Sequence, residues 1–181
     1  MTKVIIVSGG FDPVHVGHIR MFKDAANMAD KDARVNQVKV IVALNSDEWL
    51  ERKKGKAFMP FEERKEILQS IKHVSNVIAF EDSDDTACEA IKQVHKKYGH
   101  LTTSFFEDDM ICFANGGDRI VGNVPSEEST LCEELGIKML WNIGGAKVQS
   151  SSSLVENFEA REYAYINKKG EEDESTADSD D

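Results

Sequence analysis

The amino-acid sequence predicts an α/β fold: a doubly wound, Rossmann-like parallel sheet of about five strands with helices on both faces. Short apolar runs, typical of strands buried on both sides, alternate along the chain with segments of helical periodicity. Because crossovers between parallel strands are right-handed, this alternation places helices on both faces. Unusual clusters of Gly, His, Lys and Ser follow the predicted strands, at the sheet edge where such folds bind ligands.

The first half of the chain predicts three strands and two helices. Val4–Val7 is a β-branched run followed by a glycine turn, which indicates a buried strand. Apolar residues recur at helical spacing from Gly17 to about Asn27, and the apolar run Val38–Leu44 then completes a βαβ unit. We expect a helix with one charged face over Phe61–Ile71 and a third strand over Val74–Phe80.

The second half continues the alternation. A helix is expected over Thr86–Tyr98 and a strand over Met110–Ala114. A helix near Glu127–Leu135 stops before a glycine, as helices often do, and Lys138–Ile143 supplies the next strand. A last helix is expected to start within Ser150–Ser153.

Length and charge distribution predict one domain with a tail. A chain of 181 residues suits a single globular domain, which we place at residues 1–167. Residues 168–181 are expected to be an acidic, disordered tail, because positions 171–181 hold seven acids, no base and almost no apolar side chain. Without those seven acids the formal net charge of −11 becomes −4.

Composition argues against several classes of function. An acidic chain lacks the basic surface that displaces counterions from nucleic acid, so we expect a small-molecule substrate. Three widely spaced cysteines without a Cys-x-x-Cys pair favour neither a disulfide framework nor a zinc site, and they suit a cytoplasmic location. We see no export leader and no apolar run that could span a bilayer, so we expect no membrane partner.

Residues 9–18 carry the strongest chemical signal. The segment reads Gly-Gly-Phe-Asp-Pro-Val-His-Val-Gly-His and places His15 and His18 at the start of the first helix. A helix N-terminus attracts anions, and both imidazoles can face one phosphate while Gly17 leaves the space between them open. On these residues alone, an ordinary histidine pair and a metal site with Asp12 as a third ligand stay open.

This segment resembles the His-x-Gly-His signature of the cytidylyltransferase-like nucleotidyltransferases, and the resemblance extends over roughly residues 3–160. It is closest in motif to the heptose-phosphate adenylyltransferases and the glycerol-phosphate cytidylyltransferases. Residues 45–64 resemble a second block, in which these enzymes place a phosphate-binding lysine in a loop. Gly-Gly-Asp-Arg at 116–119 and the serines at 151–153 resemble the third and fourth blocks.

The resemblance implies that the 1–167 domain transfers a nucleoside monophosphate, AMP or CMP, from ATP or CTP to a phosphorylated sugar or polyol and releases pyrophosphate. It implies Mg²⁺ bound with the triphosphate rather than by metal ligands of the protein, and it allows a homodimer. The implied catalytic residues are His15, His18 and Lys54. The implied nucleotide-binding residues are Gly9, Gly10, Phe11, Asp12, Gly17, Gly117, Asp118, Arg119, Ser151, Ser152 and Ser153. Contacts to the acceptor or to a phosphate are assigned to Lys56, Arg64 and Lys147.

The chain departs from the family pattern in two places. Residues 144–149 stand where the glycerol-phosphate enzymes carry Arg-Thr-Glu-Gly-Ile, and we take Lys147 as the replacement for the missing arginine. The connection over residues 99–109 is longer than the family predicts. Acceptor identity is therefore open.

Several of these residues also have structural explanations that need no ligand. The lysines around position 54 also fit a solvated basic loop, and Trp49 and Trp141 are expected in the core rather than in the site. Asp12 precedes a proline and suits a structural turn. Two other functions stay open: a non-catalytic nucleotide-binding protein, and a metal-dependent hydrolase that uses His15 and His18 as ligands.

Overall fold

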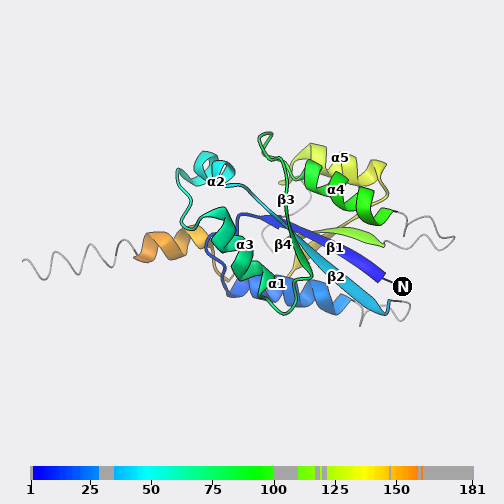
Figure 1. The fold of residues 1–181 in the computed structure, drawn as a ribbon, viewed down its shortest axis with the longest axis horizontal. Helices are drawn as coiled ribbons and strands as arrows, with labels where there is room; N and C mark the ends of the chain where they lie inside the picture. The colour runs from blue at the N-terminus through cyan, green and yellow to red at the C-terminus, as the bar shows by residue number, and fades with distance from the viewer. Residues whose placement is uncertain are drawn as a thin grey trace, which may run out of the picture.

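The computed structural model describes residues 2–28, 35–99, 110–116, 119, 122–146, 148–158 and 160. They form a five-stranded parallel sheet with helices on both faces (Figure 1). The strand order is β3-β2-β1-β4-β5, numbered in chain order, so the chain winds outward in both directions from β1, and the predicted fold class is confirmed.

The strands are β1 (Thr2–Gly9), β2 (Gln37–Leu44), β3 (Asn76–Ala79), β4 (Ile111–Gly116) and β5 (Lys138–Ile143). The helices are α1 (Val16–Ala26), α2 (Asp47–Lys54), α3 (Phe61–Gln69), α4 (Cys88–Tyr98) and α5 (Ser126–Glu134).

The sheet is buried on both faces because alternate side chains of each strand enter two different cores. One core packs the sheet against α1 and α3, through residues such as Phe22 and Leu68. The other packs it against α4 and α5, through residues such as Ile91 and Cys132. Figure 1 shows these helix pairs on opposite sides of the sheet. The apolar runs of the sequence are therefore strands of a parallel sheet.

One predicted loop is wrong. Residues 45–56 contain the helix α2, which begins after the N-cap residue Ser46 and ends at Gly55. The hydroxyl of Ser46 accepts a hydrogen bond from the N–H of Trp49 over 3.0 Å. Gly55 adopts a left-handed conformation with φ of 82°, which glycine does at no steric cost. The lysines of this region thus lie on a helix with a fixed direction.

The last described element is a helix over residues 151–158, as expected from the serine run. Ser150 caps it, because its hydroxyl accepts a hydrogen bond from the N–H of Ser153 over 3.1 Å. The predicted boundary at 167 and the acidic tail lie outside the described residues. Within the described ranges, no helix has the length and apolar character needed to cross a membrane.

Candidate active site

A cavity of about 340 Å³ lies at the carboxyl ends of β1, β4 and β5. This is the point at which the strand order reverses, where doubly wound sheets bind ligands, and the volume suits a small molecule. The starts of α1 and of the 151–158 helix and the end of α2 all reach its wall. Among the residues singled out from the sequence, the cavity is lined by Gly9, Gly10, Phe11, His15, Gly17, His18, Lys54, Arg119, Ser151 and Ser152.

His15 and His18 cap α1 reciprocally. The N–H of Gly17 donates to Nδ1 of His15 over 3.1 Å, and the N–H of His15 donates to Nδ1 of His18 over 3.3 Å. The two rings stack with their centroids 3.7 Å apart. A ring nitrogen that accepts a hydrogen bond carries no proton, so each neutral imidazole carries its proton on Nε2. The cavity wall therefore holds two imidazole Nε2–H donors side by side.

The environment of His18 keeps its ring neutral. Burial lowers the pKa of His18 to about 3, and the nearby His15 and Lys54 lower it in the same direction. The ring of Phe11 meets it edge-on, with centroids 4.8 Å apart. At physiological pH His18 of the unliganded protein is therefore a neutral hydrogen-bond donor. An anion in the cavity would favour the charged form of the ring.

Two glycines of the segment 9–18 lie close to side chains elsewhere in the protein. A Cβ at Gly17 would lie 3.0 Å from Cε1 of His15, so this glycine leaves room for the imidazole. A Cβ at Gly10 would lie 2.7 Å from the side chain of Leu50, so Gly10 allows α2 to pack on the loop after β1. The sequence predicted that Gly17 leaves an open space between the two histidines, but their rings stack on each other, and the contact of Gly10 with Leu50 was not predicted.

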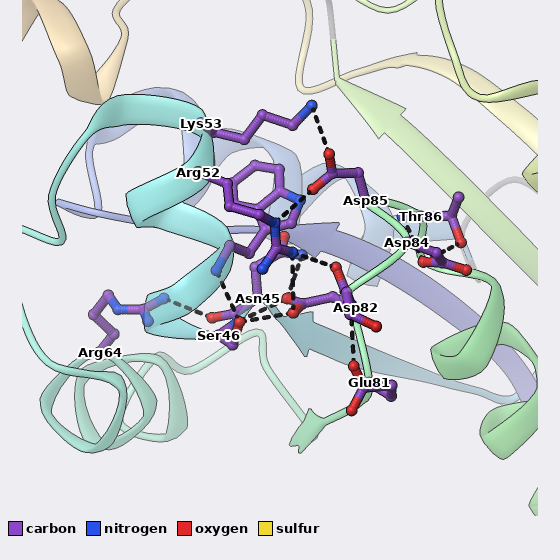
Figure 2. Close-up of polar contacts among 12 residues, drawn as sticks. Asn45, Ser46, Arg52, Lys53, Arg64, Glu81, Asp82, Asp84, Asp85 and Thr86 are labelled. Carbon is purple, nitrogen blue, oxygen red and sulfur yellow. Dashed lines mark hydrogen bonds and ion pairs between the residues drawn. The ribbon is translucent and has the colours of Figure 1, made fainter.

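The acidic loop after β3 anchors the start of α2 (Figure 2). The buried carboxylate of Asp82 accepts hydrogen bonds from the N–H and hydroxyl of Ser46, over 2.8 and 2.7 Å, and from the side-chain amide of Asn45 over 3.0 Å. Arg52 donates to the backbone carbonyl of Asp82 over 2.6 Å and pairs with Asp85 over 3.3 Å. The helix that carries the lysines is thereby held against the end of β3.

The last two lysines of α2 lie in different environments. Nζ of Lys53 is 3.6 Å from the carboxylate of Asp85, as Figure 2 shows. Lys54 instead donates to the backbone carbonyl of Asp12 over 3.2 Å and lines the main cavity. Burial lowers the pKa of Lys54, although Asp12 acts in the opposite direction. Lys54 is thus the lysine of α2 that the fold directs to this cavity.

The structure gives the Asp12 side chain a structural role, and its predicted contact with the nucleotide stays a prediction. Its carboxylate is 2% exposed and accepts hydrogen bonds from the backbone N–H groups of Phe58 and Met59, over 2.6 and 2.8 Å. These bonds tie the loop after β1 to the segment between α2 and α3. The side chain therefore holds two loops together, in agreement with the structural explanation of its position before a proline.

The structure also corrects the prediction for Arg64. The side chain is completely buried, and its Nη1 donates to the backbone carbonyls of Gly10 and Asn45 over 2.7 and 3.0 Å. Nε donates to the carbonyl of Met59 over 3.0 Å, and Nη2 pairs with Asp47 over 2.5 Å. With these donors engaged in the interior, Arg64 joins three loops and lines neither of the cavities beside α2.

The serines divide between the cavity and the helix cap. Ser151 and Ser152 line the cavity, and the hydroxyl of Ser151 donates to the carbonyl of Pro13 over 2.9 Å. Ser153 does not line it, and its hydroxyl oxygen lies 2.7 Å from that of Ser150. Ser153 is the third residue of the helix and its N–H bonds to the N-cap residue Ser150, so its predicted contact with the ligand stays a prediction.

Arg119 reaches the cavity from the end of β4 and has a buried acidic neighbour. Its Nη1 lies 4.0 Å from Oε2 of Glu128, whose side chain is 3% exposed. Oε1 of Glu128 accepts a hydrogen bond from the N–H of Ala87 over 2.8 Å. Burial raises the pKa of Glu128, and Arg119 partly offsets this. Glu128 was not singled out from the sequence, where its helix looks merely polar.

Some predicted residues lie elsewhere. Gly117, Asp118 and Lys147 are outside the described residues, and their roles stay predictions. Lys56 lines a neighbouring cavity. Trp49 was expected in the core but is half-buried and lines the main cavity. Recognition of α2 would have placed this residue at the ligand edge of the sheet. Other lining residues not predicted individually are Met21, Gly116, Ile143, Gly144, Gly145, Ala146, Val148, Gln149 and Ser150.

A family model matches most of this chain. The family model described as "Cytidylyltransferase-like" matches residues 6–155. Glycerol-3-phosphate cytidylyltransferase of Bacillus subtilis (strain 168) is 36% identical over 76 residues, 42% of this chain and 53% of the relative. FAD synthase of Pyrococcus abyssi (strain GE5 / Orsay) is 33% identical over 91 residues, 50% of this chain and 55% of the relative.

A larger relative aligns with more of this chain. The bifunctional protein HldE of Enterobacter sp. (strain 638) is 30% identical over 132 residues, 71% of this chain and 26% of the relative. The chain spans about half the length, or less, of these curated relatives. The lipopolysaccharide core biosynthesis protein from Thermoplasma volcanium GSS1 superposes with a TM-score of 0.49 at 18% identity, over 77% of this chain and 93% of that structure.

Proposed function

This chain belongs to the cytidylyltransferase-like family, and we propose that it is a nucleotidyltransferase that transfers AMP or CMP from ATP or CTP to a phosphorylated sugar or polyol and releases pyrophosphate. The names of its relatives support this class of reaction, since they include a glycerol-3-phosphate cytidylyltransferase. The chain's own activity and substrates are the subject of the proposal.

One observation carries the proposal: two helix N-termini and a lysine meet at a single cavity. His15 and His18 stand at the start of α1, Ser151 and Ser152 at the start of the 151–158 helix, and Lys54 at the end of α2. Helix N-termini favour anions, and N–H and ammonium donors satisfy several phosphate oxygens at once. A triphosphate offers the required row of oxygens.

These groups suit phosphoryl chemistry that needs no covalent intermediate. The acceptor's phosphate is already ionised at neutral pH, so its oxygen attacks the α-phosphorus as the bond from that phosphorus to the β-phosphate oxygen breaks. Pyrophosphate leaves with the electron pair. His15 and His18 donate Nε2–H hydrogen bonds to the phosphate oxygens that gain charge in the transition state, and Lys54 binds the α-phosphate. Catalysis then consists of positioning the substrates and stabilising this charge.

Mg²⁺ enters this proposal with the triphosphate. Among the described residues, no group of three His, Cys, Asp or Glu is placed to hold a metal ion. The carboxylate of Asp12 is occupied by backbone N–H groups. Phosphate oxygens and water are ligands that Mg²⁺ prefers, and the ion would neutralise phosphate charge when bound. We propose that the ion enters the cavity as part of a magnesium–triphosphate substrate.

Pyrophosphate release tests the proposal. The purified chain is incubated with ATP or CTP and a panel of glycerol 3-phosphate, heptose 1-phosphate and phosphopantetheine. We expect pyrophosphate only when both a triphosphate and an acceptor are present. A non-catalytic nucleotide-binding protein would release none, and a hydrolase would release product without any acceptor; either result refutes the transferase.

Location and assembly stay predictions. Cys88, Cys112 and Cys132 are free thiols, which suits the reducing cytoplasm that we propose. The homodimer that the resemblance allows is open to a measurement of molecular mass in solution.

A further inference from the structure

Glu128 is a buried carboxylate in the first turn of α5, and its two oxygens have different surroundings. The side chain is 3% exposed. Oε1 accepts a hydrogen bond over 2.8 Å from the N–H of Ala87, the residue at the start of α4. Oε2 is also buried, and it has no hydrogen-bond partner among the described residues. Buried polar atoms in folded proteins are nearly always hydrogen-bonded, so this oxygen calls for an explanation.

Arg119 supplies positive charge beside this oxygen. Its Nη1 lies 4.0 Å from Oε2, which is too long for a hydrogen bond but close enough for strong attraction. Asp84, which accepts two bonds from Thr86 before α4 (Figure 2), and Glu127 both raise the pKa of Glu128, whereas Arg119 lowers it. A buried carboxylate next to other acids is stabilised by a cation, and removal of that cation is costly.

The side chain of Arg119 also lines the main cavity and is 37% exposed. A guanidinium carries five N–H donors in a planar fork, so an interaction with one carboxylate oxygen leaves donors for a second anion. A long side chain that moves freely loses rotamer freedom when it binds a ligand, and a side chain that is already held at the site loses less. A buried carboxylate that holds Arg119 therefore favours the use of its other donors on a ligand.

We propose that Glu128 is a positioning residue, whose carboxylate holds the guanidinium of Arg119 at the wall of the main cavity so that the remaining donors bind a phosphate of the nucleotide. This inference rests on the proposed function for the identity of the ligand. Glu128 acts through Arg119 and does not itself line the cavity. Its Oε1 serves the start of α4, and its Oε2 serves the arginine.

Glu128→Gln tests the assignment, because its amide oxygen still accepts the N–H of Ala87 while the negative charge is lost. The α,β-methylene analogues of ATP and CTP, which cannot release pyrophosphate, are titrated calorimetrically into the full chain. We expect Glu128→Gln to raise the Kd of the analogue that binds by about fivefold. Direct electrostatics predicts the opposite sign, since loss of a negative charge near the cavity favours an anion. Glu127→Gln is the matched control, because it makes the same charge change at the adjacent exposed residue and should alter Kd by less than about twofold.

A double-mutant cycle measures the coupling of the two residues. Arg119→Gln should raise Kd by about tenfold or more, the scale of a hydrogen bond to a charged group. Adding Glu128→Gln to it should raise Kd no further, because the carboxylate then has no arginine to hold. Inorganic triphosphate, which has neither base nor ribose, should show the same pattern. A loss confined to the nucleotides would overturn the contact with phosphate.

Stability measurements separate positioning from a purely structural role. If Glu128→Gln lowers the thermal midpoint but leaves Kd unchanged, Glu128 only supports the start of α4 and the proposal is overturned. Circular dichroism shows whether each variant is folded. Glu128→Asp replaces Glu128→Gln in the cycle if the latter does not fold, since it keeps the charge but withdraws it from Arg119 by one methylene. It should raise Kd in the wild type and not in Arg119→Gln.

The outcomes distinguish the two proposals. Nucleotide binding that weakens in Glu128→Gln, without pyrophosphate release from any acceptor pair, supports the positioning role and overturns the transferase. Pyrophosphate release with the same Kd in wild type and Glu128→Gln, or with a full further loss of affinity in the double variant, overturns the positioning role and leaves the transferase. Absence of both nucleotide binding and release overturns both.

Discussion

The histidine pair shows how single residues can serve the fold and the site together. In both rings Nδ1 accepts a backbone N–H in the cap of α1. The same bonds place the proton of each neutral ring on Nε2. The start of α1 therefore sets the tautomer of the two imidazoles that line the cavity. We expect the loss of Nδ1 to lower the stability of the helix and the loss of Nε2 to weaken the action on the ligand.

Two substitutions at His18 separate these effects. His18→Ala removes both nitrogens, so we expect turnover to fall by about a hundredfold to a thousandfold, as for a lost oxyanion donor, and the unfolding free energy to fall by about 1 kcal/mol from the lost cap. His18→Asn keeps a short acceptor near the position of Nδ1, so it should retain most of the stability but not the turnover. Steady-state pyrophosphate release and urea denaturation measure the two quantities. Turnover above about a tenth of wild type in both variants would contradict the assignment.

The lowered pKa of His18 predicts a dependence of stability on pH. The pKa is about 3 in the folded protein against an ordinary value of 6.5. Between these values the unfolded chain binds a proton at this position that the folded chain does not, so the unfolding free energy falls as pH drops from about 6.5 toward 3. His18→Asn has no imidazole and should lose less stability between pH 7 and pH 5. Equal losses in wild type and variant, measured by urea denaturation, would show that His18 is readily protonated in the fold.

At the scale of elements, apolar periodicity predicted each strand of the described residues and the helices of the two cores. It failed at α2, where the apolar residues are Leu50, which is buried, and Trp49, which is half-buried. The end signals were nevertheless in the sequence: Ser46 as N-cap, acids in the first turn, bases in the last turn and Gly55 after it. The predicted strand over 74–80 was too long at its start, because the N–H of Val74 bonds to the carbonyl of Ile71 in a turn.

Two neighbouring glycines after β5 give a matched pair of substitutions. Gly144 has φ of 87°, and a Cβ there would lie 2.7 Å from the backbone N of Met21 in α1. Gly145 has φ of 79°, but a Cβ there meets nothing within 4 Å. Gly145→Ala should cost about 1–2 kcal/mol for its backbone conformation alone. Gly144→Ala should cost about 1–3 kcal/mol more, because backbone cannot move aside as a flexible side chain can. Equal unfolding free energies of the two variants would contradict this close packing of β5 on α1.

At the scale of the whole molecule, the fold determines which sequence motifs meet. The glycine and histidine segment could be placed at the site from the sequence, because parallel strands end at one edge. The direction of single side chains could not, since it depends on packing between distant segments. Arg64 follows an acidic stretch that resembles a ligand block, yet its guanidinium enters the interior. Trp49 looked like a core residue, yet it lines the cavity.

Arg64 connects the loops of this edge to one another. Its donors pair with carbonyls after β1, after β2 and before α3, and with the carboxylate of Asp47 at the start of α2. No single local element contains these partners. Arg64 therefore acts together with the buried carboxylates of Asp12 and Asp82 in holding segments of the ligand edge that are far apart in the sequence.

Arg64→Lys tests this structural role against the original expectation of a phosphate contact. A lysine keeps the charge but cannot reproduce the planar fork of donors, so buried carbonyls and part of Asp47 lose their partners. We expect the unfolding free energy to fall by about 3 kcal/mol or more, the scale of a broken buried ion pair. Arg52→Lys is the control, since Arg52 is 38% exposed and also bonds a carbonyl and carboxylates of a neighbouring loop. That exposed change should cost less than about 1 kcal/mol. If Arg64→Lys instead keeps its stability and raises only the KM of the triphosphate, then Arg64 reaches the ligand in solution and the network described here does not hold the edge together.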